Sequence, residues 1–165
     1  MRRQRPVLAN AGAVACLGVL AAGLAGCGSG NVTVDSPTLH GADAKACRAL
    51  VDALPGSVSD QRRRRVDPPD AYAAAWGDPA IVLRCGVPKP AGFDKYSSCQ
   101  VANGVGWFIP ENQITGAPED IVMTTVGRAQ NVEVRIPSEY WPPAATMVDL
   151  TRAVKTTIRE VKPCL

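Results

Sequence analysis

Two segments of the chain carry apolar side chains at three- and four-residue steps, the spacing of a helix that buries one face. The first segment, residues 43–54, is followed by a Pro-Gly pair that stops helices. The second begins after Pro142 and Pro143, reaches Val161 and ends before Pro163. The pattern therefore predicts a short helix early in the chain and a longer one near its end.

Between these helices the chain carries one continuous apolar run and two hairpin patterns. Residues 80–85 form the apolar run, which is typical of a strand in the centre of a sheet. The pair Asn103 and Gly104 lies between two strand patterns and is the strongest short signal for a hairpin turn. A second hairpin is expected around residues 127–130, because residues 131–136 alternate apolar side chains with charged or polar ones.

The other stretches before the central run are expected to carry little regular structure. Residues 57–70 are polar and read as a loop, and residues 71–76 are expected to add a helical turn. About four strands between two helices favour an α+β fold. We expect a single two-layer domain with a mainly antiparallel sheet, on which an N-terminal and a C-terminal helix pack.

The start of the chain has the order of a bacterial lipoprotein export signal. Arginines precede an apolar run over residues 7–24, and Leu24-Ala25-Gly26-Cys27 places small residues before a cysteine. Cleavage there makes Cys27 the first mature residue, which carries fatty acyl chains such as palmitate. An uncleaved N-terminal anchor is the weaker alternative, because the most apolar part of the run is shorter than the roughly 20 residues that cross a bilayer.

This interpretation divides the chain into three parts. Residues 1–26 are the lipoprotein signal peptide, residues 27–42 are the lipidated N-terminus with a flexible tether, and residues 43–165 are one globular domain. The expected location is the extracytoplasmic face of the plasma membrane. The first expected partner is therefore the membrane, through the N-terminal lipid.

The charge balance argues against two classes of binding. The chain has 18 basic and 15 acidic side chains, and three arginines leave with the signal, so the exported part carries 15 of each. A net charge of zero argues against a nucleic-acid partner and against a polybasic membrane binder, because both depend on a net electrostatic field. The four arginines at residues 62–65 are a local exception. One interpretation is that these arginines bind anionic lipid or a phosphate-bearing wall polymer. We favour the other, a solvated loop in which nearby aspartates balance the positive charge.

Four cysteines remain in the expected domain: Cys47, Cys85, Cys99 and Cys164. An even number outside the reducing cytosol predicts two disulfides, for which three pairings are possible. We favour Cys47 with Cys85 and Cys99 with Cys164, each closing a long loop worth roughly 3 to 4 kcal/mol. A zinc site is disfavoured and no metal is expected, because zinc-binding cysteines usually come in close pairs.

The sequence contains no catalytic motif. Its single histidine, His40, lies in the expected tether, which argues against histidine-dependent triads and zinc sites. Phosphate-binding loops and serine-hydrolase motifs are also missing, so we predict no cofactor and no catalytic residue. An enzyme is the alternative if two carboxylates meet in the fold as acid and base. The candidate carboxylates are Asp67, Asp70, Asp78, Glu111, Glu119 and Asp120.

Four residues make a candidate binding surface. The indoles of Trp76 and Trp107 combine an apolar face with one hydrogen-bond donor, which suits a groove for an apolar group or a sugar, although core packing is commoner. Asp78 and Arg128 complete the candidate surface. For Asp78 we favour the alternative, a structural ion pair with Arg84 or Arg128.

Three segments resemble a known family: residues 73–86, residues 103–107 and residues 124–128. They are similar to an uncharacterised actinobacterial envelope family, catalogued only as domain of unknown function 3515, and the Trp-Gly-Asp-Pro segment is the most specific part. The resemblance implies exported or membrane-anchored proteins of one domain with no assigned activity. Cys47 and Cys85 match the family's usual cysteine pair.

These features together predict an uncharacterised cell-envelope lipoprotein that acts as a non-catalytic binding or accessory module. Beyond the membrane, its expected partners are a cell-wall component or another envelope protein. The alternative is a cell-wall-modifying enzyme that uses paired carboxylates. Acidic side chains converging in an open cleft near Trp76 or Trp107 would favour the enzyme.

Overall fold

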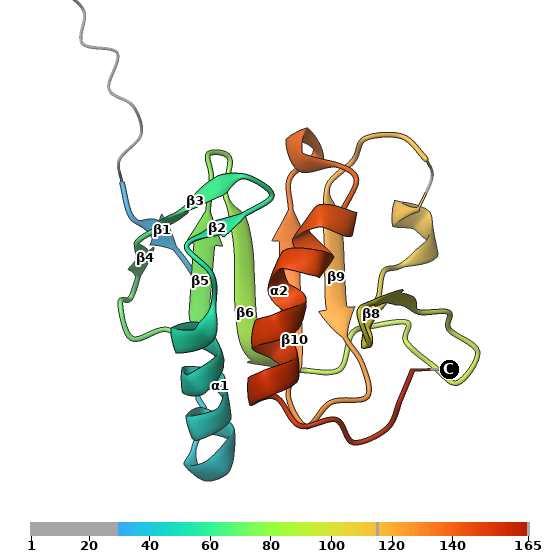
Figure 1. Ribbon diagram of the computed structural model, residues 1–165, viewed down its shortest axis with the longest axis horizontal. Helices are drawn as coiled ribbons and strands as arrows, with labels where there is room; N and C mark the ends of the chain where they lie inside the picture. The colour runs from blue at the N-terminus through green and yellow to red at the C-terminus, as the bar shows by residue number, and fades with distance from the viewer. Residues whose placement is uncertain (1–29, 115, 165) are drawn as a thin grey trace, which may run out of the picture.

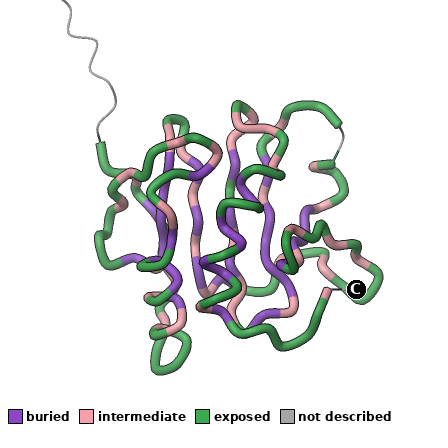
Figure 2. Tube along the Cα trace, in the orientation of Figure 1, coloured by how far each residue is buried: buried purple, intermediate pink, exposed green. Residues whose placement is uncertain are grey.

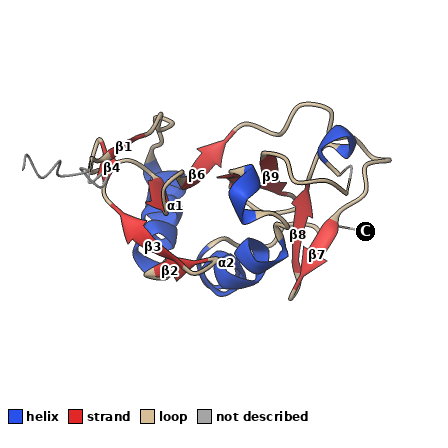
Figure 3. Ribbon diagram, turned by 90° about the horizontal axis from the view of Figure 1, so that it is seen from above, coloured by secondary structure: helices blue, strands red, loops and turns tan. Residues whose placement is uncertain are grey.

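A computed structural model describes residues 30–114 and 116–164 of the chain (Figure 1). The predicted signal peptide, Cys27 and the first residues of the predicted tether lie outside this range. The fold is α+β, as predicted: two helices lie on one face of a sheet in which all neighbouring strands run antiparallel (Figure 3). Among the described residues, no helix has the length and apolarity needed to cross a membrane.

The main sheet has eight strands in the order β2-β3-β5-β6-β10-β9-β8-β7, and a separate parallel pair joins β1 to β4. The helices are α1 (Gly41–Ala53) and α2 (Ala144–Thr157), and two short 3₁₀ turns are η1 (Glu111–Gln113) and η2 (Ser138–Tyr140). The strands are β1 (Val32–Thr33), β2 (Ser57–Val58), β3 (Gln61–Arg64), β4 (Val66–Asp67), β5 (Ala73–Trp76), β6 (Ile81–Val87), β7 (Gln100–Ala102), β8 (Val105–Phe108), β9 (Ile121–Thr125) and β10 (Asn131–Ile136).

The predicted number of about four strands is wrong, because two segments assigned to other structure form strands. Residues 57–70, expected to be a loop, contain β2, β3 and β4, and residues 71–76, expected to be a helical turn, contain β5. Strand β5 is buried on both faces and pairs with β3 and β6, which outweighs the helix propensity of its alanines. The run of arginines in β3 resembles a loop, but pairing with β2 and β5 makes it a strand.

Both predicted hairpins and the central strand are confirmed. Strands β7 and β8 meet at Asn103 and Gly104, whose φ angles of 47° and 84° belong to a tight hairpin turn. Strands β9 and β10 form the second hairpin, and β6 lies between β5 and β10. The β6 side chains of Ile81 and Leu83 have no exposed area, because they face the helices.

The two helices close the core over one face of the sheet (Figure 2). Leu50 of α1 and Leu150 of α2 are fully buried in the same cluster. Helix α2 ends at Thr157, earlier than predicted, and Val161 is 60% exposed. The amide of Val161 donates to the carbonyl oxygen of Gly127 at 2.8 Å, which directs this segment away from the helix axis.

Part of the predicted tether is built into the domain. Strand β1 pairs with β4, and Val34 packs with Ala71 and Ala73 on the sheet face away from the helices. This corrects the flexible tether expected as far as residue 42. The apolar side chains of Val32 and Val34 find partners distant in sequence, which no local pattern shows.

A disulfide joins α1 to β6. Cys47 and Cys85 are bonded, with their Cα atoms 5.5 Å apart and no exposed area on either residue, and this confirms the first predicted pair. The structure also joins Cys99, which precedes β7, to Cys164 in the C-terminal tail, with 6.3 Å between the Cα atoms. The fold thus brings the second predicted pair within the range of a disulfide.

Candidate functional site

The four predicted surface residues do not form one surface. Trp76 and Trp107 have no exposed area and pack in the core beneath the helices. Trp76 Nε1 donates to the carbonyl oxygen of Pro55 at 3.0 Å, whereas Trp107 Nε1 has no partner among the described residues. Both indoles are therefore enclosed by the core, and neither presents a face to a ligand.

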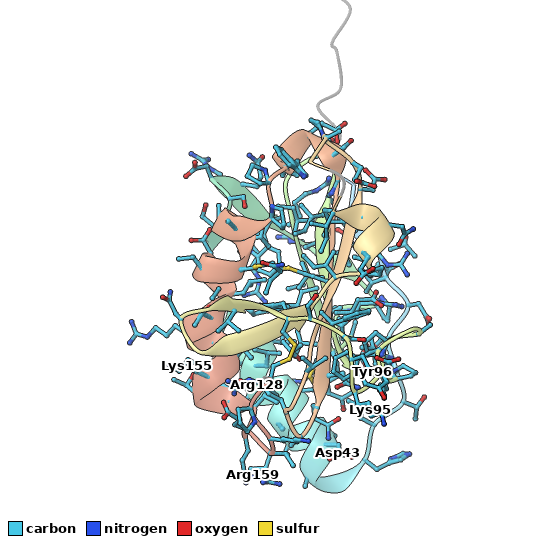
Figure 4. All side chains as sticks on the ribbon, turned by 90° about the vertical axis from the view of Figure 1, so that its right-hand side faces the viewer. Asp43, Lys95, Tyr96, Arg128, Lys155 and Arg159 are labelled. Atoms are coloured by element: carbon cyan, nitrogen blue, oxygen red, sulfur yellow. A yellow bond between two sulfur atoms is a disulfide. The ribbon has the colours of Figure 1, made fainter. Side chains whose placement is uncertain are left out.

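Arg128, which is labelled in Figure 4, connects its own segment to two others through hydrogen bonds. Its side chain is 4% exposed. Nη1 donates to the carbonyl oxygen of Ile158 at 2.8 Å, and Nη2 donates to the carbonyl oxygen of Gly104 at 3.2 Å and to Glu160 Oε2 at 3.3 Å. Because a buried arginine needs such partners, Arg128 ties the β7–β8 turn to the segment after α2 and does not face a ligand.

Asp78 lies in a cleft between the start of the described chain and the β5–β6 turn. Its side chain is 68% exposed, and its Oδ1 atom lies 3.4 Å from Arg64 Nη1, which makes an ion pair. The cleft has a volume of about 980 Å³. We call it the arginine cleft, and its lining residues are Gly30, Asn31, Asp60, Gln61, Arg62, Arg63, Arg64, Arg65, Gly77 and Asp78.

Arg63 anchors one wall of the arginine cleft to the end of α1. Its guanidinium donates to the carbonyl oxygens of Val51 and Leu54, at 2.9 and 3.1 Å, and lies over the ring of Trp76 at 6.0 Å. Burial lowers the pKa of Arg63, although the nearby Asp52 carboxylate opposes this shift. Arg63 therefore supports α1 and the core, and was not predicted to do so.

The other arginines differ in how far their side chains are engaged. Arg64 donates to the carbonyl oxygens of Gly77 and Gly30, at 3.0 and 2.8 Å, and so fixes the start of the described chain to the cleft. Arg62 and Arg65 are exposed, and their side chains have no partner within the described range. The cleft therefore presents two uncommitted guanidinium groups.

A compact charge cluster lies on the sheet face away from the helices. Glu133 Oε1 accepts hydrogen bonds from Arg84 Nη2 at 2.8 Å and from Arg135 Nε at 3.0 Å. Burial raises the pKa of Glu133, but the hydrogen bonds from Arg135 and Arg84 outweigh it, and the net pKa lies below the usual 4.5. Ionised Glu133 therefore stabilises the folded state. The contribution is present at pH values above the unfolded-state pKa of Glu133 and is lost as pH falls through its lower folded-state pKa, so we assign the cluster a structural role.

The carboxylates considered for acid-base chemistry come from four parts of the chain, in which Asp67 is near Asp70 and Glu119 is next to Asp120. Asp67 ends β4, Asp78 lies in the β5–β6 turn, and Glu111 begins η1. Asp120 precedes β9 and accepts a hydrogen bond from the Ser138 amide at 2.9 Å. Within residues 30–114 and 116–164, no group of three His, Cys, Asp or Glu side chains is placed to hold a metal ion.

A pocket that was not predicted from the sequence lies between η1 and the start of α2. Its volume is about 270 Å³. Trp141 is half-buried and Ile114 is 49% exposed, so its apolar surface is open to solvent. We call it the Trp141 pocket, and its lining residues are Gln100, Ile109, Gln113, Ile114, Gly116, Ile121, Trp141, Pro142, Pro143, Ala144 and Met147.

Hydrogen bonds to β9 and to the β5–β6 turn position the segments on both sides of the Trp141 pocket. Gln113 Oε1 in η1 accepts from the Val122 amide of β9 at 2.8 Å. The Tyr140 hydroxyl in η2 donates to the carbonyl oxygen of Pro79 at 2.9 Å, and Trp141 follows directly. The local signal in the sequence is Trp141 before two prolines, but the prolines by themselves predict only the start of a helix.

The fold and these sites define a disulfide-bonded, two-layer α+β domain with one arginine-lined cleft and one apolar pocket in its described part. A family model described as Protein of unknown function (DUF3515) matches residues 7–163, and the chain belongs to this family. The comparison with curated proteins found no match, and neither did the comparison with solved structures.

Proposed function

We propose that this chain is a lipid-anchored protein of the cell envelope that binds a ligand and catalyses no reaction. The anchor is supported by the arginines, the apolar run over residues 7–24 and the Leu24-Ala25-Gly26-Cys27 box. The family match starts at residue 7 and so includes the apolar run. Acyl chains on Cys27 would hold the domain at the outer face of the membrane.

The Trp141 pocket is the observation that carries the binding role. Its lining contains apolar side chains and two glutamines but no titratable group, so it holds neither an acid nor a base. Its volume of about 270 Å³ is near the lower end for small-molecule sites, which start at roughly 300 Å³. The ligand class that fits is an alkyl or other small apolar group of an envelope molecule.

The anchor is tested by labelling cells that express the full chain with an alkyne analogue of palmitate. We expect the wild-type chain to be labelled and Cys27→Ser to be unlabelled, because the thiol is the acceptor of the diacylglycerol. Cys16→Ser is the matched control, since it removes a cysteine that leaves with the signal, and it should keep the label. Labelled Cys27→Ser, or unlabelled wild type, would contradict the anchor.

The pocket is tested with the apolar fluorescent probe N-phenyl-1-naphthylamine and the chain from residue 27 with Cys27→Ser. We expect Ile114→Asp to weaken probe binding about tenfold or more, because a carboxylate at the rim must lose water when the probe enters. Ile114 is 49% exposed, so the fold should be little affected. Val161→Asp, at a 60% exposed site outside the pocket, is the control. Equal binding by both variants argues against the pocket.

A further inference from the structure

Basic side chains outnumber acidic ones among the residues that line the arginine cleft. Four arginines and two aspartates line it. Asp78 pairs with Arg64, which leaves Asp60 as the acidic lining residue near Arg62 and Arg65. A guanidinium group presents a planar fork of donors that matches the oxygens of a phosphate, so the chemistry of this surface favours a phosphate-bearing partner.

The cleft also lies close to the expected attachment point of the chain. Gly30 lines the cleft, and its carbonyl oxygen accepts a hydrogen bond of 2.8 Å from Arg64 Nη2. Cys27 is three residues earlier, and three extended residues span roughly 10 Å. In Figure 1, the described chain enters the domain beside β1, β3 and β4, on the side that carries these arginines.

We propose that the arginine cleft docks onto the phosphates of anionic lipid headgroups in the membrane that holds Cys27. This inference deepens the proposed function and rests on its anchoring step. The anchor is about 10 Å of chain from Gly30, which lines the cleft, so it keeps the cleft close to headgroups whose charges are screened over about 8 Å at physiological salt. The exported side chains sum to zero charge, so the domain as a whole is not attracted to an anionic membrane. The local excess of positive charge in the arginine cleft instead turns this side of the domain towards the headgroups.

In this arrangement the domain is held close to the membrane, whereas the tether expected from the sequence would let it stand away from the membrane. Strand β1 is paired with β4, and Arg64 holds Gly30, so few residues remain to let the domain move away from the membrane. The domain would rest with the β1, β3 and β4 side towards the headgroups. Strand β7 is at the opposite end of the sheet from β3, so it would point away from the attachment side.

The test uses the chain from residue 27 with Cys27→Ser, which holds every described residue and both hydrophobic clusters. Its co-sedimentation is measured with vesicles of phosphatidylcholine alone and with vesicles that also contain phosphatidylglycerol. We expect binding only to the second kind, and a roughly 10- to 30-fold loss of partitioning for Arg62→Gln/Arg65→Gln, since each basic side chain near an anionic surface contributes about fivefold.

The matched control is Arg152→Gln/Arg159→Gln, which removes the same charge from exposed arginines outside the cleft and should bind like the parent chain. Equal weakening of both double variants would show a general charge effect and overturn the proposal. Absence of binding to phosphatidylglycerol vesicles would also overturn it. Because this chain carries no acyl group, the result is independent of palmitate labelling at Cys27, and the two proposals can fail separately.

Discussion

Replacing both Cys47 and Cys85 with alanine should lower the free energy of unfolding by about 4 kcal/mol. The bond closes a loop with a sequence separation of 38 residues, and opening it returns conformational freedom to the unfolded chain. Both cysteines are fully buried between α1 and β6, so losing the two sulfur atoms also removes packing contacts. Urea unfolding followed by tryptophan fluorescence measures the change, because Trp76 and Trp107 lie in the same core.

Peptide mapping without reductant accompanies this measurement. We expect one linked fragment that joins Cys47 to Cys85 and another that joins Cys99 to Cys164. A double alanine variant that unfolds within about 1 kcal/mol of the wild type, while the wild type contains the Cys47–Cys85 fragment, would show that the bond does not stabilise the domain. Free thiols at these two positions would instead contradict the bond itself.

Gly127→Ala should destabilise the domain by about 3 kcal/mol, through two additive causes. The glycine has a φ angle of 73°, which side chains rarely adopt. A Cβ atom there would clash with the carbonyl oxygen of Lys162, so the C-terminal tail would have to move. The tail is held at this point, because the amides of Val161 and Lys162 donate to the Gly127 carbonyl oxygen at 2.8 and 2.9 Å.

Gly92→Ala separates the two causes. Gly92 has a similar φ angle of 78°, but nothing lies within 4 Å of the position of its Cβ atom, so only the backbone cost of about 1 kcal/mol is expected. The difference between the two variants in urea unfolding then measures the contact with the tail. If both variants lose the same stability, the tail does not pack against Gly127 in solution.

Local sequence signals predicted the elements that local physics controls. The Asn103-Gly104 turn suits positive φ angles, and the apolar spacing in α1 matched the face that it buries. Strand β5 was missed because its alanines prefer helices in isolation, whereas burial and pairing with β6 determine their structure here. Strand β3 was missed for a similar reason. Its arginines are typical of a loop, and its strand structure depends on pairing with β5, where Arg63 lies opposite Trp76.

The candidate sites were predicted less well, because each depends on contacts between distant residues. Trp76 and Trp107 were candidates for a binding surface, and the helices bury them completely. Arg128 was another candidate, and carbonyl groups far along the chain use its donors. The Trp141 pocket was not predicted, since its walls come from segments that meet only after the sheet has formed.

The amino-acid sequence by itself determined the two helices, the two hairpins and the central strand, because turn chemistry and apolar periodicity act over a few residues. The pairing of Cys47 with Cys85 was one of three that the sequence allowed, and the fold decides it. The tertiary structure alone decided the eight-stranded order, the docking of β1 on β4, and which arginines stay uncommitted. The physical reason is that burial and charge pairing depend on neighbours in space, and those neighbours are set only when the sheet and its helices pack together.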